Sequence, residues 1–103
     1  MIKNVREESF RSEVTACNSP VLVEFYADWC GPCKIVEAEL EKFAEENSDV
    51  SVVKVNVDDD NNLAEKYGVS NVPCMILFSS GEPIKTIVGY RTKQQLKAII
   101  TEE

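Results

Sequence analysis

Two hydrophobic periods run along this chain, one typical of strands and one typical of helices. Residues 21–26 form a nearly continuous apolar run, as in a strand that is buried on both faces of a parallel sheet. Residues 51–57 alternate between apolar and polar side chains, and 84–88 returns after a turn at Gly81 as the second strand of a hairpin. The predicted strands are 2–5, 21–26, 51–57, 75–78 and 84–88.

Between these strands, apolar residues recur at the spacing of helices. The clearest case is 30–47, where an apolar stripe and a charged face indicate an amphipathic helix. The stripe comprises Val36, Leu40, Phe43 and Ala44, with Glu37, Glu41, Lys42 and Glu45 largely opposite. Thr92 and Gln95 have the spacing of a capping box at the start of the last helix. The predicted helices lie within 7–16, 30–47, 58–68 and 92–100.

The order β-α-β-α-β-α-β-β-α predicts an α/β fold with right-handed crossovers and a terminal antiparallel hairpin. The chain has 103 residues, the size of one domain, and no repeat or linker divides it. We therefore expect residues 1–103 to form a single domain.

Composition and charge narrow the classes of function. The chain has 11 Lys and Arg against 18 Asp and Glu, a net charge of −7, which argues against a nucleic-acid partner. No apolar run approaches the roughly 20 residues of a membrane span. The N-terminus lacks the apolar segment of a signal peptide, so we expect a cytoplasmic protein, monomeric, whose cysteines are reduced or catalytic.

The candidate chemistry lies in the cysteines. The chain has 4 Cys and 0 His, which excludes cysteine–histidine nucleophile pairs. Cys30 and Cys33 stand in the segment Trp-Cys-Gly-Pro-Cys-Lys at 29–34, between a predicted strand and helix. Pro32 is tolerated in a first helical turn, so Cys30 lies at the helix N-terminus, where a thiolate is stabilised. Cys33 follows one turn later on the same face, and an exposed thiolate beside an inner thiol suits thiol–disulfide exchange.

A metal site is the alternative interpretation of these cysteines. A tetrathiolate zinc site needs two Cys-x-x-Cys pairs, and this chain has one pair and no histidine. A structural zinc or iron–sulfur site would require Cys17 and Cys74 to converge on Cys30 and Cys33. A single pair at a strand-to-helix junction in a βαβ context instead indicates redox chemistry. We therefore predict no metal site.

Residues 23–34, Val-Glu-Phe-Tyr-Ala-Asp-Trp-Cys-Gly-Pro-Cys-Lys, resemble the active-site strand and loop of the thioredoxin family. Further matches in family order and spacing are Lys54, 55–58, 67–69, 72–73, Gly81 and Gly89. The resemblance covers nearly the whole chain and implies an α/β thioredoxin fold, with a central mixed five-stranded sheet flanked by four helices. It implies a protein that reduces disulfides in target proteins and is recharged by an NADPH-dependent thioredoxin reductase. It implies a redox-active Cys30–Cys33 disulfide and no bound cofactor.

The resemblance also assigns roles to single residues. Cys30 is implied to be the attacking thiolate and Cys33 the resolving thiol. Trp29 resembles the family's docking indole, although a core tryptophan would fit the sequence as well. Pro73 resembles the family's cis proline, which faces the dithiol and would expose the Val72 backbone to an extended substrate. The implied target-binding residues are Trp29, Gly31, Pro32, Val72, Pro73 and Gly89.

Glu24 interrupts the apolar run of the second strand. A carboxylate there is costly to bury unless it is paired or protonated. The family usually has Asp at this position, a buried acid implied to help deprotonate the resolving cysteine through water. Lys54 matches the family lysine near that acid and could pair with Glu24. An edge-exposed Glu24 and a solvated Lys54 are the alternatives.

Three positions outside the motif carry their own expectations. Ala38 stands where the family usually has a proline, so the helix should be more regular there. Cys74 follows Pro73 where the family usually has Thr, and it is either a small core residue or a further reactive thiol. Cys17 lies on the apolar face of the first helix, which predicts a buried core thiol.

The sequence thus predicts a general protein-disulfide reductase that acts through Cys30 and Cys33. One alternative is a disulfide isomerase or oxidase on the same fold. Another is a thioredoxin-like binding subunit without catalysis, because a fold does not fix a function.

Overall fold

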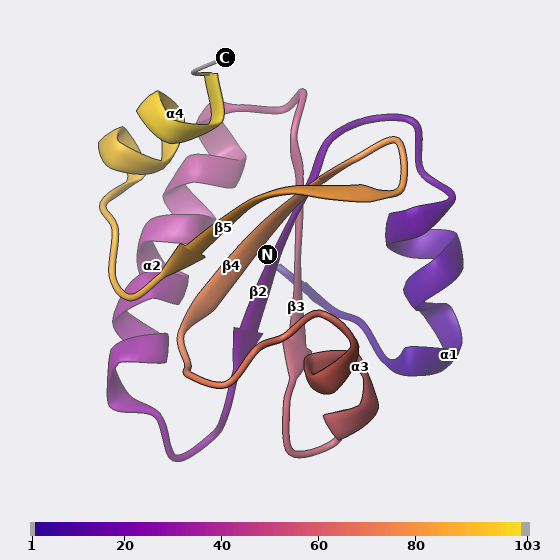
Figure 1. The fold of residues 1–103 in the computed structure, drawn as a ribbon. Coiled ribbons are helices and arrows are strands. Elements are labelled where there is room, and N and C mark those ends of the chain that lie inside the picture. The colour runs from indigo at the N-terminus through magenta and orange to yellow at the C-terminus, as the bar shows by residue number, and fades with distance from the viewer. Residues whose placement is uncertain (1, 102–103) are drawn as a thin grey trace.

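The computed structural model describes residues 2–101, which form a mixed five-stranded sheet flanked by helices (Figure 1). The elements in chain order are β1 (Lys3–Asn4), α1 (Glu7–Phe10), the π-helical segment η1 (Arg11–Thr15), β2 (Val21–Tyr26), α2 (Gly31–Glu46), β3 (Ser51–Asn56), α3 (Asn61–Lys66), β4 (Cys74–Ser79), β5 (Glu82–Val88) and α4 (Lys93–Thr101). Every strand and helix predicted from the sequence is present.

The strands are ordered β1-β3-β2-β4-β5 across the sheet. β1 and β2 run parallel to β3, whereas β4 runs antiparallel to both β2 and β5. β2 is the central strand and has both faces covered, which explains its unbroken apolar run. The C-terminal end of β2 therefore adjoins the C-terminal end of β3 and the N-terminal end of β4.

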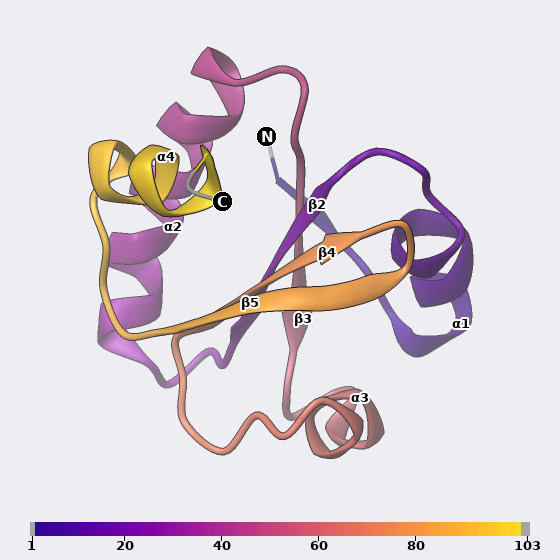
Figure 2. The same cartoon turned by 45° about the horizontal axis from the view of Figure 1, so that its top comes forward.

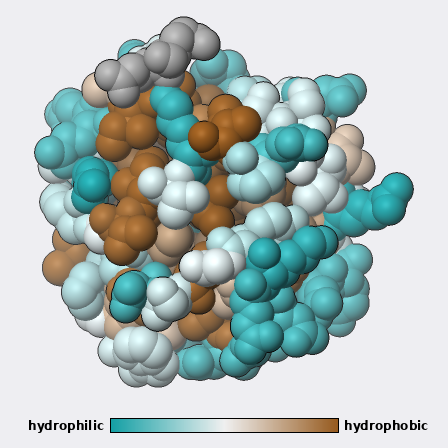
Figure 3. All heavy atoms as spheres, in the orientation of Figure 1, coloured by the Kyte–Doolittle hydropathy of each residue, from teal (hydrophilic) through white to brown (hydrophobic). Residues whose placement is uncertain are grey.

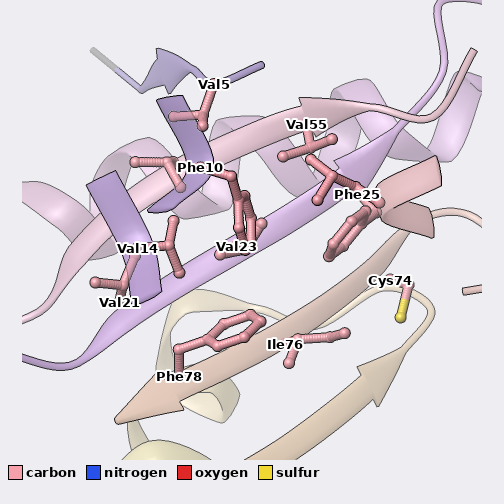
Figure 4. Packing of buried hydrophobic residues seen from close by; sticks show 12 residues of the cluster. Val5, Phe10, Val14, Val21, Val23, Phe25, Val55, Cys74, Ile76 and Phe78 are labelled. Carbon is pink, nitrogen blue, oxygen red and sulfur yellow. The ribbon is translucent and has the colours of Figure 1, made fainter. Parts of the chain in front are cut away.

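Helices cover both faces of the sheet. α2 and α4 lie against one face, and α1 and α3 lie against the other (Figures 1 and 2). On the α1 side, Phe10, Tyr67 and Phe78 form an aromatic cluster whose ring centroids are 5.1 to 5.7 Å apart. Figure 4 shows Phe10 and Phe78 in this core together with Val23 and Phe25 of β2. The alternating side chains of β2 therefore point in turn into two separate cores.

The capping box predicted for the last helix is confirmed. The backbone N–H of Thr92 donates to Gln95 Oε1 at 2.9 Å, and the backbone N–H of Gln95 donates to Thr92 Oγ1 at 3.2 Å. These two bonds satisfy backbone donors that a helix N-terminus leaves without partners. α2 is also continuous through Ala38, as expected without a proline.

The first helix ends earlier than the prediction for Cys17 requires. α1 widens into η1, where the N–H of Ala16 donates to the carbonyl of Arg11, five residues back, at 2.7 Å. The helix then ends, so Cys17 follows it instead of lying on its apolar face. Cys17 is half-buried and packs against the edge of the α1-side core. The prediction of a fully buried helical thiol was therefore wrong.

Hydrophobic side chains are distributed unevenly over the surface (Figure 3). In the view of Figure 3, hydrophobic spheres gather over the side where β5 and α4 lie, whereas hydrophilic spheres cover α3. β5 is an edge strand, and Ile84 and Val88 on it are exposed. Pro83 and Lys85 on the same strand are residue types that disfavour pairing of an edge with another chain.

Candidate active site

The Cys30–Cys33 pair forms a disulfide at the junction between β2 and α2. Cys30 is the N-cap of α2, Pro32 lies in the first turn, and the Cα atoms of the two cysteines are 5.3 Å apart. The backbone N–H of Cys33 donates to Cys30 Sγ at 3.1 Å. Cys30 therefore occupies the predicted position, where a helix N–H and the positive end of the helix dipole stabilise negative charge on sulfur.

The burial of this disulfide differs from the expectation of an exposed Cys30. Cys30 is 4% exposed and Cys33 is 2% exposed, and Ala27, Tyr26, Val57 and Val72 pack around them. In this oxidised state the two sulfurs are bonded to each other, and the surrounding side chains cover Cys30 almost as fully as Cys33. Gly31 and Pro32 are exposed between them, and a Cβ on Gly31 would meet no atom within 4 Å.

The loop before β4 packs against the dithiol. The Val72–Pro73 peptide bond is cis, which confirms the expectation for Pro73, and Val72 contacts the cluster of Cys30 and Cys33. The N–H of Gly89 donates to the carbonyl of Pro73 at 3.0 Å, and the backbone of Val72 makes no hydrogen bond to any described residue. Pro73 itself is buried. The structure thus brings Val72, Pro73 and Gly89 together beside the disulfide.

Trp29 lies on the surface next to the disulfide. Its side chain is 72% exposed, which excludes the alternative of a core tryptophan. The indole is oriented by a hydrogen bond from Nε1 to Asp58 Oδ2 at 2.9 Å. It forms one wall of an open groove of about 230 Å³, and the full lining is Trp29, Val57, Val69, Ser70, Asn71 and Val72.

Glu24 is buried on the central strand β2. It is 1% exposed, and neither carboxylate oxygen has a hydrogen-bond partner among the described residues. Burial, together with the nearby charge of Glu37, raises the pKa of Glu24 to about 8, and Lys54 lowers it. The alternative of an edge-exposed Glu24 was wrong, because β2 is the central strand.

A second cavity joins Glu24 to the disulfide. Its volume is about 150 Å³, enough for several water molecules. The lining residues are Glu24, Tyr26, Ala27, Asp28, Cys33, Lys34, Glu37 and Lys54. Glu24 and Cys33 thus line one partly open space, through which water can carry a proton between them.

Lys54 does not pair with Glu24, which corrects the sequence-based expectation. Although Lys54 is the register partner of Glu24, its Nζ forms a hydrogen-bonded ion pair with Glu37 Oε2. Lys54 also lies over the Tyr26 ring, 5.1 Å from its centroid. Burial lowers the pKa of Lys54, but the hydrogen bond and charge of Glu37 outweigh this effect and raise it overall. An ion pair at the partly exposed mouth of the cavity costs less desolvation than one at Glu24.

Sequence reasoning missed the roles of Glu37 and Asp58. The helical spacing assigns Glu37 to the charged face of its helix, yet its carboxylate binds Lys54 of the interior strand β3. The available signal was its position four residues after Cys33, which puts both on one face of α2. Asp58 stands at the start of a predicted helix and in the family match at 55–58, and nothing in its spacing points to the indole of Trp29.

Cys74 lies in the α1-side core rather than at the dithiol surface. It belongs to the same buried cluster as Phe25 of β2 and Ile76 of β4, and Figure 4 shows it at one end of that cluster. Burial raises the pKa of its thiol, which disfavours the reactive thiolate. The structure therefore favours the interpretation of Cys74 as a small core residue. Among residues 2–101, no group of three or more His, Cys, Asp or Glu side chains is arranged to bind a metal ion.

Comparisons with known proteins give a consistent result. The thioredoxin family model matches residues 1–102. A thioredoxin from Streptomyces clavuligerus is 40% identical over 96 residues, which is 93% of this chain and 90% of that protein. A bifunctional thioredoxin reductase/thioredoxin from Mycobacterium leprae is 44% identical over 93 residues, which is 89% of this chain and 20% of that protein.

A solved structure shares the fold. A point mutant of a thioredoxin from Halobacterium salinarum superposes with a TM-score of 0.87 at 41% identity, covering 95% of this chain and 86% of that one. The described helices include none with the length and apolar character needed to cross a membrane. With Cys30 and Cys33 as its redox-active pair, the chain is a protein-disulfide oxidoreductase and belongs to the thioredoxin family.

Proposed function

We propose that this protein is a general reductase of protein disulfides in the cytoplasm, recharged by an NADPH-dependent thioredoxin reductase. The observation that carries the proposal is the position of Cys30 at the N-cap of α2, with the Cys33 N–H bonded to its sulfur. This position stabilises a thiolate in the reduced protein without a histidine. The groove beside Trp29 and the unpaired backbone of Val72 supply a docking surface next to that sulfur.

In the first exchange step the Cys30 thiolate attacks one sulfur of the target disulfide. The target S–S bond breaks, the second target sulfur leaves as a thiolate and takes a proton, and Cys30 becomes joined to the target in a mixed disulfide. An extended target segment pairs with the backbone of Val72 and passes Gly31 and Gly89, where no bulky side chain obstructs it. Trp29 contacts the target beside the reacting sulfurs.

In the second step Cys33 resolves the mixed disulfide. Its thiol gives its proton, through water in the cavity, to the Glu24 carboxylate, and the resulting thiolate attacks Cys30 Sγ. The target sulfur bound to Cys30 leaves as a thiolate and takes a proton from water, and the Cys30–Cys33 disulfide forms, so that two electrons have passed to the target. The oxidised structure is the product of this step. There the pKa of Glu24 is raised to about 8, so the carboxyl holds the proton and must lose it to water in the cavity before it can accept another.

A reductase must return two electrons to the Cys30–Cys33 disulfide after each cycle. A relative in which thioredoxin reductase and thioredoxin share one chain supports that partnership for this protein. A mixture of NADPH, thioredoxin reductase and this protein should therefore reduce insulin, with NADPH absorbance as the readout. Absence of NADPH consumption with the wild-type protein would contradict the assignment of the partner.

Insulin reduction with dithiothreitol tests the direction and the catalytic pair. Wild-type protein should accelerate the precipitation of reduced insulin, and Cys30→Ser should abolish the acceleration. A Cys74→Ser variant is the matched control and should keep the full rate, because Cys74 lies in the core. Full activity of Cys30→Ser would support the non-catalytic binding subunit instead. A Cys30–Cys33 reduction potential above about −200 mV would favour the isomerase or oxidase alternative.

Stopped-flow reduction of a protein disulfide tests the proton acceptor. Glu24→Gln keeps the size of the side chain but removes the carboxylate, so resolution by Cys33 should slow by about 10-fold or more. Rates that match the wild type throughout pH 6–9 would eliminate Glu24 from the mechanism.

A further inference from the structure

Lys54 has two carboxylates within reach and binds only one of them. Glu24 is its register partner on the neighbouring strand, and adjacent strands lie about 5 Å apart, so a lysine side chain can span the gap. The Nζ atom instead binds Glu37 Oε2, and Tyr26 lies beneath the ammonium group. As a result, neither oxygen of Glu24 has a hydrogen-bond partner among the described residues.

The position of Glu37 explains this choice. Glu37 lies on α2 one turn after Cys33, and both residues line the cavity that reaches Glu24. The Glu37 and Lys54 side chains are 26% and 22% exposed, whereas Glu24 is 1% exposed. Because the pair remains in contact with solvent, it keeps part of the hydration that a pair at Glu24 would lose.

We propose that Glu37 is a positioning residue for the dithiol chemistry: by binding Lys54 at the mouth of the cavity, it leaves Glu24 without a cation and so able to hold the proton released by Cys33. This inference rests on the proposed role of Glu24. It assigns to α2 both the resolving thiol and the group that keeps the proton acceptor basic.

Other charges near Glu24 do not provide the same control. The ionisable groups that share its cavity are Tyr26 and Asp28 from β2 and the following loop, Cys33, Lys34 and Glu37 from α2, and Lys54 from β3. β4 contributes the apolar Met75 as the register partner of Glu24. Within this set, Glu37 raises the pKa of Glu24 and Lys54 lowers it. Removal of Glu37 acts in one direction through both groups, since a repulsive charge is lost and the lysine is released.

The test is a titration of the Glu24 carboxyl in the oxidised full-length protein by carbon-13 NMR, with Glu24→Gln used to assign the signal. In Glu37→Ala the midpoint should fall by about 1–3 pH units, because Lys54 can then approach Glu24. Alanine keeps the helix propensity of this position. In the double variant Glu37→Ala/Lys54→Met the midpoint should rise again by a similar amount, since the cation is gone.

Glu41→Ala is the matched control, because it removes the same charge one turn further along α2 at an exposed position. Its midpoint should equal that of the wild type. A Glu37→Ala midpoint within about 0.3 pH units of the wild type would overturn the proposal, as would a double variant that titrates like Glu37→Ala. A failure of the proposed Glu24 function is detected by a separate measurement. In that case Glu24→Gln would reduce a protein disulfide at the wild-type rate, whatever the titration shows.

Discussion

The buried Glu24 should make the stability of the oxidised protein depend on pH, and Glu24→Gln should remove that dependence. The raised pKa means that the folded protein binds this proton more tightly than the unfolded chain does. The contribution of protonated Glu24 to the stability of the folded protein is therefore complete below the ordinary glutamate pKa of 4.5. It is lost as the pH rises through about 8, where Glu24 ionises in the folded protein. A glutamine has no proton to lose in this range.

The size of the effect follows from the two pKa values. The difference between 4.5 and about 8 corresponds to about 5 kcal/mol at roughly 1.4 kcal/mol per pKa unit. About 4 kcal/mol of this falls between pH 5 and pH 9, where the unfolded carboxyl is largely ionised and the folded carboxyl loses its proton. That is a large part of the 5–15 kcal/mol that stabilises a typical domain.

Urea unfolding followed by far-ultraviolet circular dichroism at pH 5, 7 and 9 measures this dependence. Both proteins are kept oxidised, so that Cys30 and Cys33 do not titrate. The free energy of unfolding of the wild type, relative to Glu24→Gln, should fall by about 4 kcal/mol from pH 5 to pH 9. Glu41→Gln serves as the control and should parallel the wild type. A constant difference between the wild type and Glu24→Gln at all three values would refute the reasoning.

Two further predictions concern the turn glycines and the free cysteines. Gly81→Ala should destabilise the protein by at least about 2 kcal/mol in urea unfolding, because a Cβ there would lie 2.4 Å from the carbonyl oxygen of Thr15 at a φ of +85°. Gly68→Ala also has a positive φ, +71°, but meets no atom within 4 Å and should cost about 1 kcal/mol, so equal losses would contradict the steric argument. Cys74 should react with iodoacetamide at pH 7.5 far more slowly than the half-buried Cys17 in the oxidised protein, as followed by mass mapping. Comparable labelling of the two thiols would restore the interpretation of Cys74 as a reactive thiol.

The elements of the fold could be predicted because their signals are local. The apolar run of β2 and the alternation in β3 follow from burial, and the capping box at Thr92 and Gln95 needs only a spacing of three residues. The Cys30–Cys33 disulfide could also be predicted from a local signal, because one helical turn brings the two sulfurs together.

The remaining features depend on contacts between distant segments. A helical wheel assigns Glu37 to the charged face, and only the packing of α2 on the sheet brings it to Lys54. The π-helical turn after Phe10, which displaces Cys17, has no local signature in the sequence. The wall of the Trp29 groove at 69–71 belongs to a loop whose path is set by the buried Pro73 and by the tertiary packing around Val72.

The central claim is that Cys30 attacks target disulfides and Cys33 resolves the product. A Cys33→Ser variant cannot resolve, so incubation with insulin should accumulate a covalent complex that is linked through Cys30 and released by dithiothreitol. Mass spectrometry of the tryptic fragments identifies the joined cysteines, and Cys30→Ser provides the comparison. The account predicts a Cys30-linked complex in Cys33→Ser and none in Cys30→Ser. Complexes joined through Cys33, Cys17 or Cys74, or no complex in either variant, would contradict it.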